Sequence, residues 1–165
     1  MADALAVITR AISEHHAIRQ HVRLAGDSVN DIEALITVQR AQTGWSQSSI
    51  AALEEKRNQM QQAISFLDEG LRNHFGFEER ALPPFFGDLL MKAILREHHT
   101  IAGQIESARA AVSNITLEGL EQRALLSQKS AIQAAVNQLC QAIEEHAQHE
   151  EIILNMMKKA LETEA

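Results

Sequence analysis

The sequence lacks tyrosine altogether and has a single cysteine and only two prolines among its 165 residues. Because Cys140 has no second cysteine to pair with, an internal disulfide framework is excluded, and this cysteine usage fits a reducing compartment. No apolar run approaches the roughly 18 residues of a membrane-spanning helix, and the first residues lack the pattern of a secretory signal. We therefore expect a cytoplasmic protein with no membrane partner.

Positive charge is also scarce, since 15 lysines and arginines stand against 22 aspartates and glutamates, for a formal net charge of −7. Nucleic-acid binding relies on a positively charged surface, so we expect no nucleic acid as a partner. The chain has no glycine-rich phosphate loop, no His-Glu-x-x-His motif and no plausible Ser–His–Asp arrangement. These absences argue against P-loop nucleotide binding, zinc-protease chemistry and serine-hydrolase chemistry.

Alanine, leucine, glutamate, glutamine and isoleucine dominate the chain, and no alternating strand pattern stands out. We expect an all-α fold: one domain over residues 1–165, built as an antiparallel up-down-up-down four-helix bundle with long helices. The first helix is expected from Asp3 to Gln42, and Gly26 could kink or interrupt it. The stretch "TGWSQSS" then separates it from a second helix that begins near Ser49.

Two further breaks divide the rest of the chain. Pro83 and Pro84 end the second helix because proline lacks an N–H and clashes with the preceding turn. Asp88 is expected to cap the third helix, which "SNIT" ends. The third helix is shorter than its neighbours, so we expect residues 113–119 to climb the bundle in an extended or irregular form before the fourth helix. A separate short helix there is the other possibility.

Each helical segment carries one stripe of mostly apolar residues at helical spacing, which is typical of packed bundle helices. The stripes are Ile8, Ile12, His15, Val22, Ala25, Val29, Ile32 and Ile36; Met60, Ile64, Leu67, Leu71, His74, Glu78 and Ala81; Met91, Ile94, His98, Ile101, Ile105, Ala108 and Val112; and Ile132, Val136, Leu139, Ile143, His146, Glu150, Ile153 and Met157.

Six stripe residues are polar: one histidine in each helix, and a glutamate four residues after the histidine in the second and fourth helices. They are His15, His74, Glu78, His98, His146 and Glu150. In an antiparallel bundle all six lie toward the same end. Burying two carboxylates without compensation is very costly, and a metal centre resolves this, since imidazoles and carboxylates suit iron, manganese or zinc. Four imidazoles and two carboxylates suit two ions rather than one. The alternative is a hydrogen-bonded His–Glu network without metal.

The remaining histidines point to no other site. None of the eight histidines has a glutamate three residues before it, which argues against the ferritin-like di-iron pattern. Haem ligation would leave the two core glutamates unexplained. His16, His21 and His99 are expected on solvated faces. His149 lies at the edge of its stripe and is expected at the surface, although it could reach the metal or its ligands.

Charged and apolar residues near these six are expected to play supporting roles. Glu79 and Glu151 are expected at the surface, where either could hydrogen-bond a ligand. Arg19 is expected to extend to solvent, to guard the site or to pair with such a carboxylate. A further group is expected to pack in the core or to form an apolar wall that controls access to the site: Phe75, Phe77, Phe85, Phe86, Met156 and Met157.

The pattern H…HxxxE…H…HxxxE resembles the hemerythrin-like, or HHE cation-binding, domain family. It is carried by "EHHAIR", "HFGFEE", "EHHTI" and "HAQHEE" and spans Ala11 to Ile153. The resemblance implies a non-heme di-iron centre bridged by Glu78 and Glu150. Oxygen-carrying hemerythrins have a further histidine where this chain has Ala102, and an aspartate five residues after the last histidine, where this chain has a glutamate at four. The excess length of this chain lies around residues 44–49, opposite the site.

These departures leave one iron with fewer protein ligands, which disfavours reversible oxygen carriage and favours chemistry or sensing. We therefore expect two iron ions, rather than manganese or zinc, in a centre that binds or reacts with O2, peroxide or NO, for example in oxidative or nitrosative stress. The alternative is an iron or oxygen sensor, or an iron-storage module, that acts through a protein partner. A purely structural bundle is the third possibility.

Overall fold

The structure is a computed structural model, which describes residues 2–40, 47–114 and 122–163. These residues form four long α-helices: α1 (Ala2–Arg40), α2 (Gln47–Ala81), α3 (Pro83–Ser113) and α4 (Gln122–Thr163). No strand occurs in these ranges. The expected all-α fold is confirmed, and α3 is the shortest helix, as predicted.

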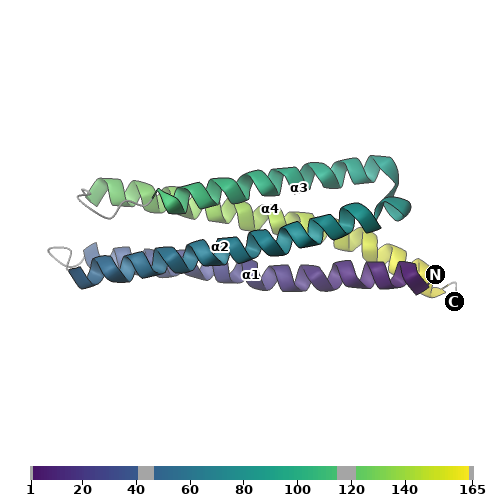
Figure 1. The fold of residues 1–165 in the computed structure, drawn as a ribbon, viewed down its shortest axis with the longest axis horizontal. Helices are drawn as coiled ribbons and strands as arrows, with labels where there is room; N and C mark the ends of the chain where they lie inside the picture. The colour runs from purple at the N-terminus through teal and green to yellow at the C-terminus, as the bar shows by residue number, and fades with distance from the viewer. Residues whose placement is uncertain (1, 41–46, 115–121, 164–165) are drawn as a thin grey trace.

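The helices form a four-membered ring in which each helix packs against the two beside it: α1 against α2 and α4, and α3 against α2 and α4. The ion pairs give the directions. Asp31 of α1 contacts Lys56 of α2, whereas Glu14 contacts His74, so residue numbers rise along one helix as they fall along the other. Figure 1 shows the same reversal at each connection, and both chain ends lie at one end of the bundle. The predicted four-helix bundle is therefore confirmed, with successive helices antiparallel.

The possible break at Gly26 does not occur, because α1 continues through it. The predicted start of the third helix at Asp88 is only partly right: α3 begins at Pro83, but the non-helical residue Gly87 divides it, and a continuous helical run starts at Asp88. Proline is tolerated in the first turn of a helix because the N–H that it lacks would have no intrahelical partner there. The change in helix direction occurs instead at Gly87, whose φ of 66° and ψ of 172° kink the helix just before Asp88.

Most residues of the predicted stripes are buried, including every stripe residue of α3. Ile12, Val22 and Ala81 are only half-buried, and so are Ile153 and Met157 in the last turns of α4, where Leu154 is fully buried instead. A pattern of alternating steps of four and three residues repeats every 3.5 residues, whereas an α-helix has 3.6 residues per turn. The pattern therefore drifts around the helix, and the next buried residue after Glu150 is Leu154 rather than Ile153. The side chain of Ile36 and most of the predicted 113–119 connection lie outside the described residues.

The core consists of two apolar clusters stacked along the bundle. The central apolar cluster includes Ile18, Leu71, Ile101 and Ile143, one from each helix. The terminal apolar cluster lies nearer the chain ends and likewise draws one or more residues from each helix: Ala11, Phe77, Ile94 and Leu154 are members, and Leu82 between α2 and α3 joins them. On every helix the predicted polar residues fall between a member of one cluster and a member of the other, so they form a polar layer with apolar packing on both sides.

The kink at Gly87 gives a test of the fold with a control in the same helix. Substituting alanine for Gly87 forces a side chain into a backbone conformation that essentially only glycine adopts, and we expect the free energy of unfolding to fall by about 1–3 kcal/mol. Gly103 is helical and has open space around its Cα, so Gly103→Ala should raise stability by roughly 0.5–1 kcal/mol. Urea denaturation of both variants measures this; changes of the same sign would contradict the assigned conformation.

Candidate metal centre

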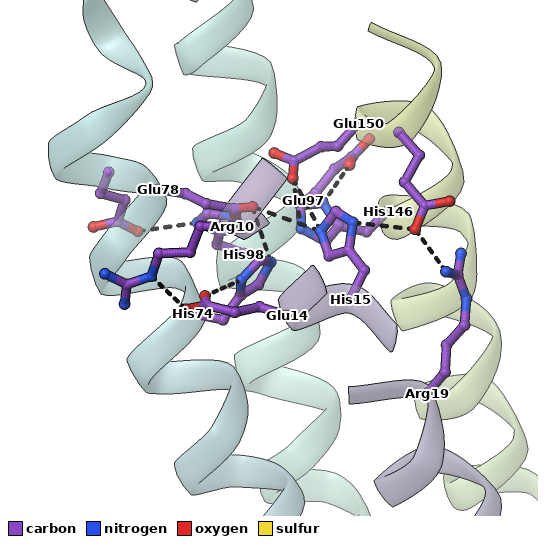
Figure 2. A network of polar contacts seen from close by, with 12 residues as sticks. Arg10, Glu14, His15, Arg19, His74, Glu78, Glu97, His98, His146 and Glu150 are labelled. Carbon is purple, nitrogen blue, oxygen red and sulfur yellow. Dashed lines mark hydrogen bonds and ion pairs between the residues drawn. The ribbon is translucent and has the colours of Figure 1, made fainter. Parts of the chain in front are cut away.

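All six predicted polar stripe residues are buried, and their side chains meet in the polar layer. Helix α1 contributes His15, α2 contributes a histidine and a glutamate, α3 contributes His98, and α4 contributes the second histidine–glutamate pair. Both glutamates are essentially inaccessible, at 0% exposure for Glu78 and 1% for Glu150. Figure 2 shows the four imidazoles and two carboxylates directed at one another from the four helices.

Glu78 lies among three imidazoles. Its Oε1 is 2.9 Å from Nε2 of His74 and 3.6 Å from Nε2 of His15, while its Oε2 is 3.3 Å from Nε2 of His98. The two oxygens of one carboxylate therefore face histidines on different helices. This is the arrangement that a carboxylate shared between two cations requires.

Glu150 takes a similar place on the opposite helix. Its Oε2 lies 3.4 Å from Nε2 of His15 and 3.9 Å from Nε2 of His146. Two groups of ligand atoms, each within 4.8 Å of one another, could hold a metal ion: His15, His74, His146 and Glu150, and Glu78, His98, His146 and Glu150. Since Glu150 and His146 belong to both groups, the two candidate positions are adjacent.

The inward-facing atoms of the polar layer are the ones that lack partners. The Nε2 atoms of all four histidines and both oxygens of both glutamates are buried, and they have no hydrogen-bond partner among the described residues. Even the 2.9 Å contact between His74 and Glu78 lacks hydrogen-bond geometry. Buried polar atoms are normally satisfied. Leaving these eight inward-facing atoms without partners would be costly, and a metal pair fits this donor set because each of them is an imidazole nitrogen or a carboxylate oxygen.

Outside the layer, each imidazole presents its Nδ1 atom to a further glutamate. His74 contacts Glu14 at 2.9 Å, His98 contacts Glu79 at 3.0 Å, His146 contacts Glu97 at 2.9 Å, and His15 contacts Glu151 at 3.3 Å. Glu79 thus hydrogen-bonds to a core histidine, one of the outcomes expected for it, whereas Glu151 comes within 3.3 Å of His15 without forming a hydrogen bond. The roles of Glu14 and Glu97 were missed, although each directly precedes a core histidine in the sequence.

The other expected supporting residues divide clearly. Arg19 pairs with Glu151 at 2.6 Å, one of the outcomes expected for it. His149 is 62% exposed and reaches only Glu97, at 3.1 Å, so it is not in the polar layer. Met156 is 68% exposed, so its expected core role is wrong, because it lies on the outer face of α4.

Phe75 forms part of the boundary of the polar layer. Its ring stacks on His98 with centroids 3.8 Å apart and meets His146 edge-on at 5.5 Å. On α3, Ile101 is buried at the level one turn beyond His98, whereas Ala102 is exposed. The position expected to lack a ligand therefore faces away from the layer, and the buried Ile101 occupies that turn.

Burial and neighbouring charges strongly shift the pKa values of the side chains in the polar layer. Burial opposes the charge on His15, but Glu150 and Glu78 outweigh it and raise the pKa to about 9. Burial raises the pKa of Glu150 to about 7 and lowers the pKa of His146 to about 4. Three imidazoles overcome the burial of Glu78 and hold its pKa well below its usual range. Without a metal, protons therefore supply the positive charge that the carboxylates need.

Comparisons with protein-family models, with curated proteins and with solved structures find no match for this chain. The hemerythrin-like resemblance stays a prediction from the motifs. In the described part of the chain, none of the helices is both long and apolar enough to cross a membrane.

The raised pKa of His15 predicts a pH dependence for the metal-free protein. Between its ordinary value of 6.5 and about 9, the folded state keeps a proton that the unfolded state has lost. The contribution of this proton to the free energy of unfolding is therefore complete below pH 6.5 and is lost as pH rises through this window. His98, whose pKa is also raised, acts in the same direction. Urea denaturation of metal-free protein at pH 6.5 and 9 measures this. His15→Gln should show a smaller loss, and a flat profile in the parent chain would contradict the assignment.

Proposed function

We propose that this protein holds a non-heme di-iron centre in its polar layer and that this centre binds or reacts with a small molecule such as O2, peroxide or NO. The observation that carries the proposal is the pair of overlapping ligand groups, which share His146 and Glu150 and whose inward atoms have no other partner among the described residues. The order of the motifs along the chain, which resembles that of hemerythrin-like domains, supports iron over zinc or manganese.

In this proposal the chain's six buried side chains hold the ions. His15 and His74 lie beside Oε1 of Glu78, and His98 lies beside its Oε2, so Glu78 can serve two ions at once. Glu150 reaches histidines on α1 and α4 and is the second shared carboxylate. Six protein ligands divided between two ions leave coordination positions for an exogenous ligand.

A di-iron pair supplies redox and Lewis-acid chemistry that side chains alone do not have. The protein's part is to hold the ions and to shield them. The central and terminal apolar clusters close the layer along the bundle, and Phe75 lines one side by stacking on His98. Such enclosure excludes bulk water and strengthens the interactions of a bound ligand with charged groups.

Metal analysis tests the centre directly. We expect protein purified from aerobic expression to contain about two irons per chain and to show a near-ultraviolet charge-transfer band. His74→Ala and Glu150→Ala should each lower the iron content at least several-fold because each removes a buried ligand. Glu145→Ala is the matched control, since Glu145 directly precedes His146 but is exposed and bonds to Gln141. Failure of the parent chain to take up iron even after anaerobic Fe²⁺ reconstitution would overturn the proposal.

The same loaded protein distinguishes the small-molecule roles. Stopped-flow spectra after addition of O2, hydrogen peroxide or NO should show a change in the iron band that His74→Ala abolishes. Sustained consumption of peroxide or NO would indicate a reaction, whereas a single saturable change would indicate binding or sensing. No response to any of the three would exclude the proposed small-molecule function while leaving the metal site in place.

A further inference from the structure

The four outer glutamates follow a regular order around the bundle. Glu14 on α1 contacts the histidine of α2, Glu79 on α2 contacts that of α3, Glu97 on α3 contacts that of α4, and Glu151 on α4 contacts that of α1. Every helix therefore receives one carboxylate from the preceding helix and gives one to the next. The contacts form a closed ring outside the polar layer; part of it is visible in Figure 2.

The ring follows a two-fold repeat in the sequence. Glu14 and Glu97 each directly precede a core histidine, in the two "EHH" motifs of α1 and α3. Glu79 and Glu151 each directly follow a core glutamate, in the two "EE" pairs of α2 and α4. Neighbouring positions on a helix differ by about 100°, so a residue beside a core-facing one points along the flank, toward the adjacent helix.

The contacts fix which ring nitrogen carries the proton. An ionised carboxylate only accepts hydrogen bonds, so each Nδ1 that bonds to an outer glutamate must be the donor. Nε2 is then the nitrogen that faces the core, where it can offer a lone pair to a metal. The outer glutamates are 20–43% exposed and could instead extend into water. That all four turn toward a histidine indicates a common role.

We propose that Glu14, Glu79, Glu97 and Glu151 are positioning residues that act as one ring, each orienting the metal-facing histidine of the next helix with Nδ1 protonated and Nε2 directed inward. The consequence for metal affinity rests on the proposed di-iron function, whereas the orientation of the imidazoles does not. Outer carboxylates of this kind typically raise metal affinity because they fix the ring orientation and increase the basicity of the ligand nitrogen.

One link of the ring is weaker than the others. Oε1 of Glu151 is shared between Arg19, at 2.6 Å, and Nδ1 of His15, at 3.3 Å. Nδ1 of His15 has no hydrogen-bond partner among the described residues. Glu14, which also pairs with an arginine, uses separate oxygens for Arg10 and for its histidine. His15 is therefore the least firmly oriented of the four imidazoles.

Nitrogen-15 NMR of the metal-free protein tests the orientation without any metal. A buried Nδ1–H held by a carboxylate exchanges slowly and should give a downfield resonance. We expect such resonances for His74, His98 and His146, and a faster-exchanging one or none for His15. Glu97→Ala should remove the His146 resonance and leave that of His74 in place, while Glu145→Ala should remove none. If the Nδ1–H resonances of all three partner histidines persist in Glu14→Ala, Glu79→Ala and Glu97→Ala, the proposed ring of glutamate–histidine contacts is overturned.

Fe²⁺ affinity, measured anaerobically by competition with a chromophoric chelator, tests the consequence. Alanine at Glu14, Glu79 or Glu97 should weaken Fe²⁺ binding by about 10–100-fold, and glutamine, whose carbonyl oxygen still accepts a hydrogen bond, by less. Alanine at Glu151 should cost less than tenfold, because that link is already long. Affinities equal to that of Glu145→Ala would contradict a positioning role. If the parent chain itself binds no Fe²⁺, the proposed function fails. The NMR experiment alone then decides whether the outer glutamates orient the imidazoles.

Discussion

Two carboxylates are buried in this bundle where water cannot reach them, and the rest of the structure depends on what balances their charge. Among the ion pairs of the described residues, Glu78 and Glu150 contact only imidazoles. An isolated buried carboxylate is strongly destabilising, so the layer must bind either protons or metal cations. The pKa of His15, raised to about 9, shows the first solution. The orphaned Nε2 and carboxylate atoms fit the second.

The fold keeps this layer rigid and dry. The buried residues about one helical turn before and after the polar positions belong to the central or terminal apolar cluster, so the layer cannot slide along the bundle without exposing apolar surface. The kink at Gly87 lies between Phe86 and Leu90, which pack against the terminal cluster, and is therefore outside the layer. Regular helices fix the ligand Cα positions, and the outer glutamates limit the rotation of the imidazoles on them.

The helices and all six polar stripe residues could be predicted from the sequence because helical periodicity alone decides which side chains face inward. The features that were missed depend on other quantities. The kink inside α3 depends on the φ of Gly87, and the burial of Leu154 arises because a helix with 3.6 residues per turn drifts away from a strict 4-3 pattern. The contacts of Glu14 and Glu97 depend on how two neighbouring helices are rotated relative to each other. The periodicity of a single helix does not determine that rotation. That these two precede core histidines in matching motifs was the available signal.

The departure at Ala102 acquires a different meaning in the structure. A missing histidine there was expected to leave an open metal position, yet Ala102 is exposed and Ile101 is buried in that turn. A histidine at 102 would need α3 to rotate before it could reach the layer. The set of candidate ligands is therefore two-fold, with one histidine from each helix and one glutamate from each of α2 and α4. If two ions bind as proposed, any difference between them must come from how firmly these equivalent side chains are held, and His15 is held least firmly because Glu151 shares its Oε1 with Arg19.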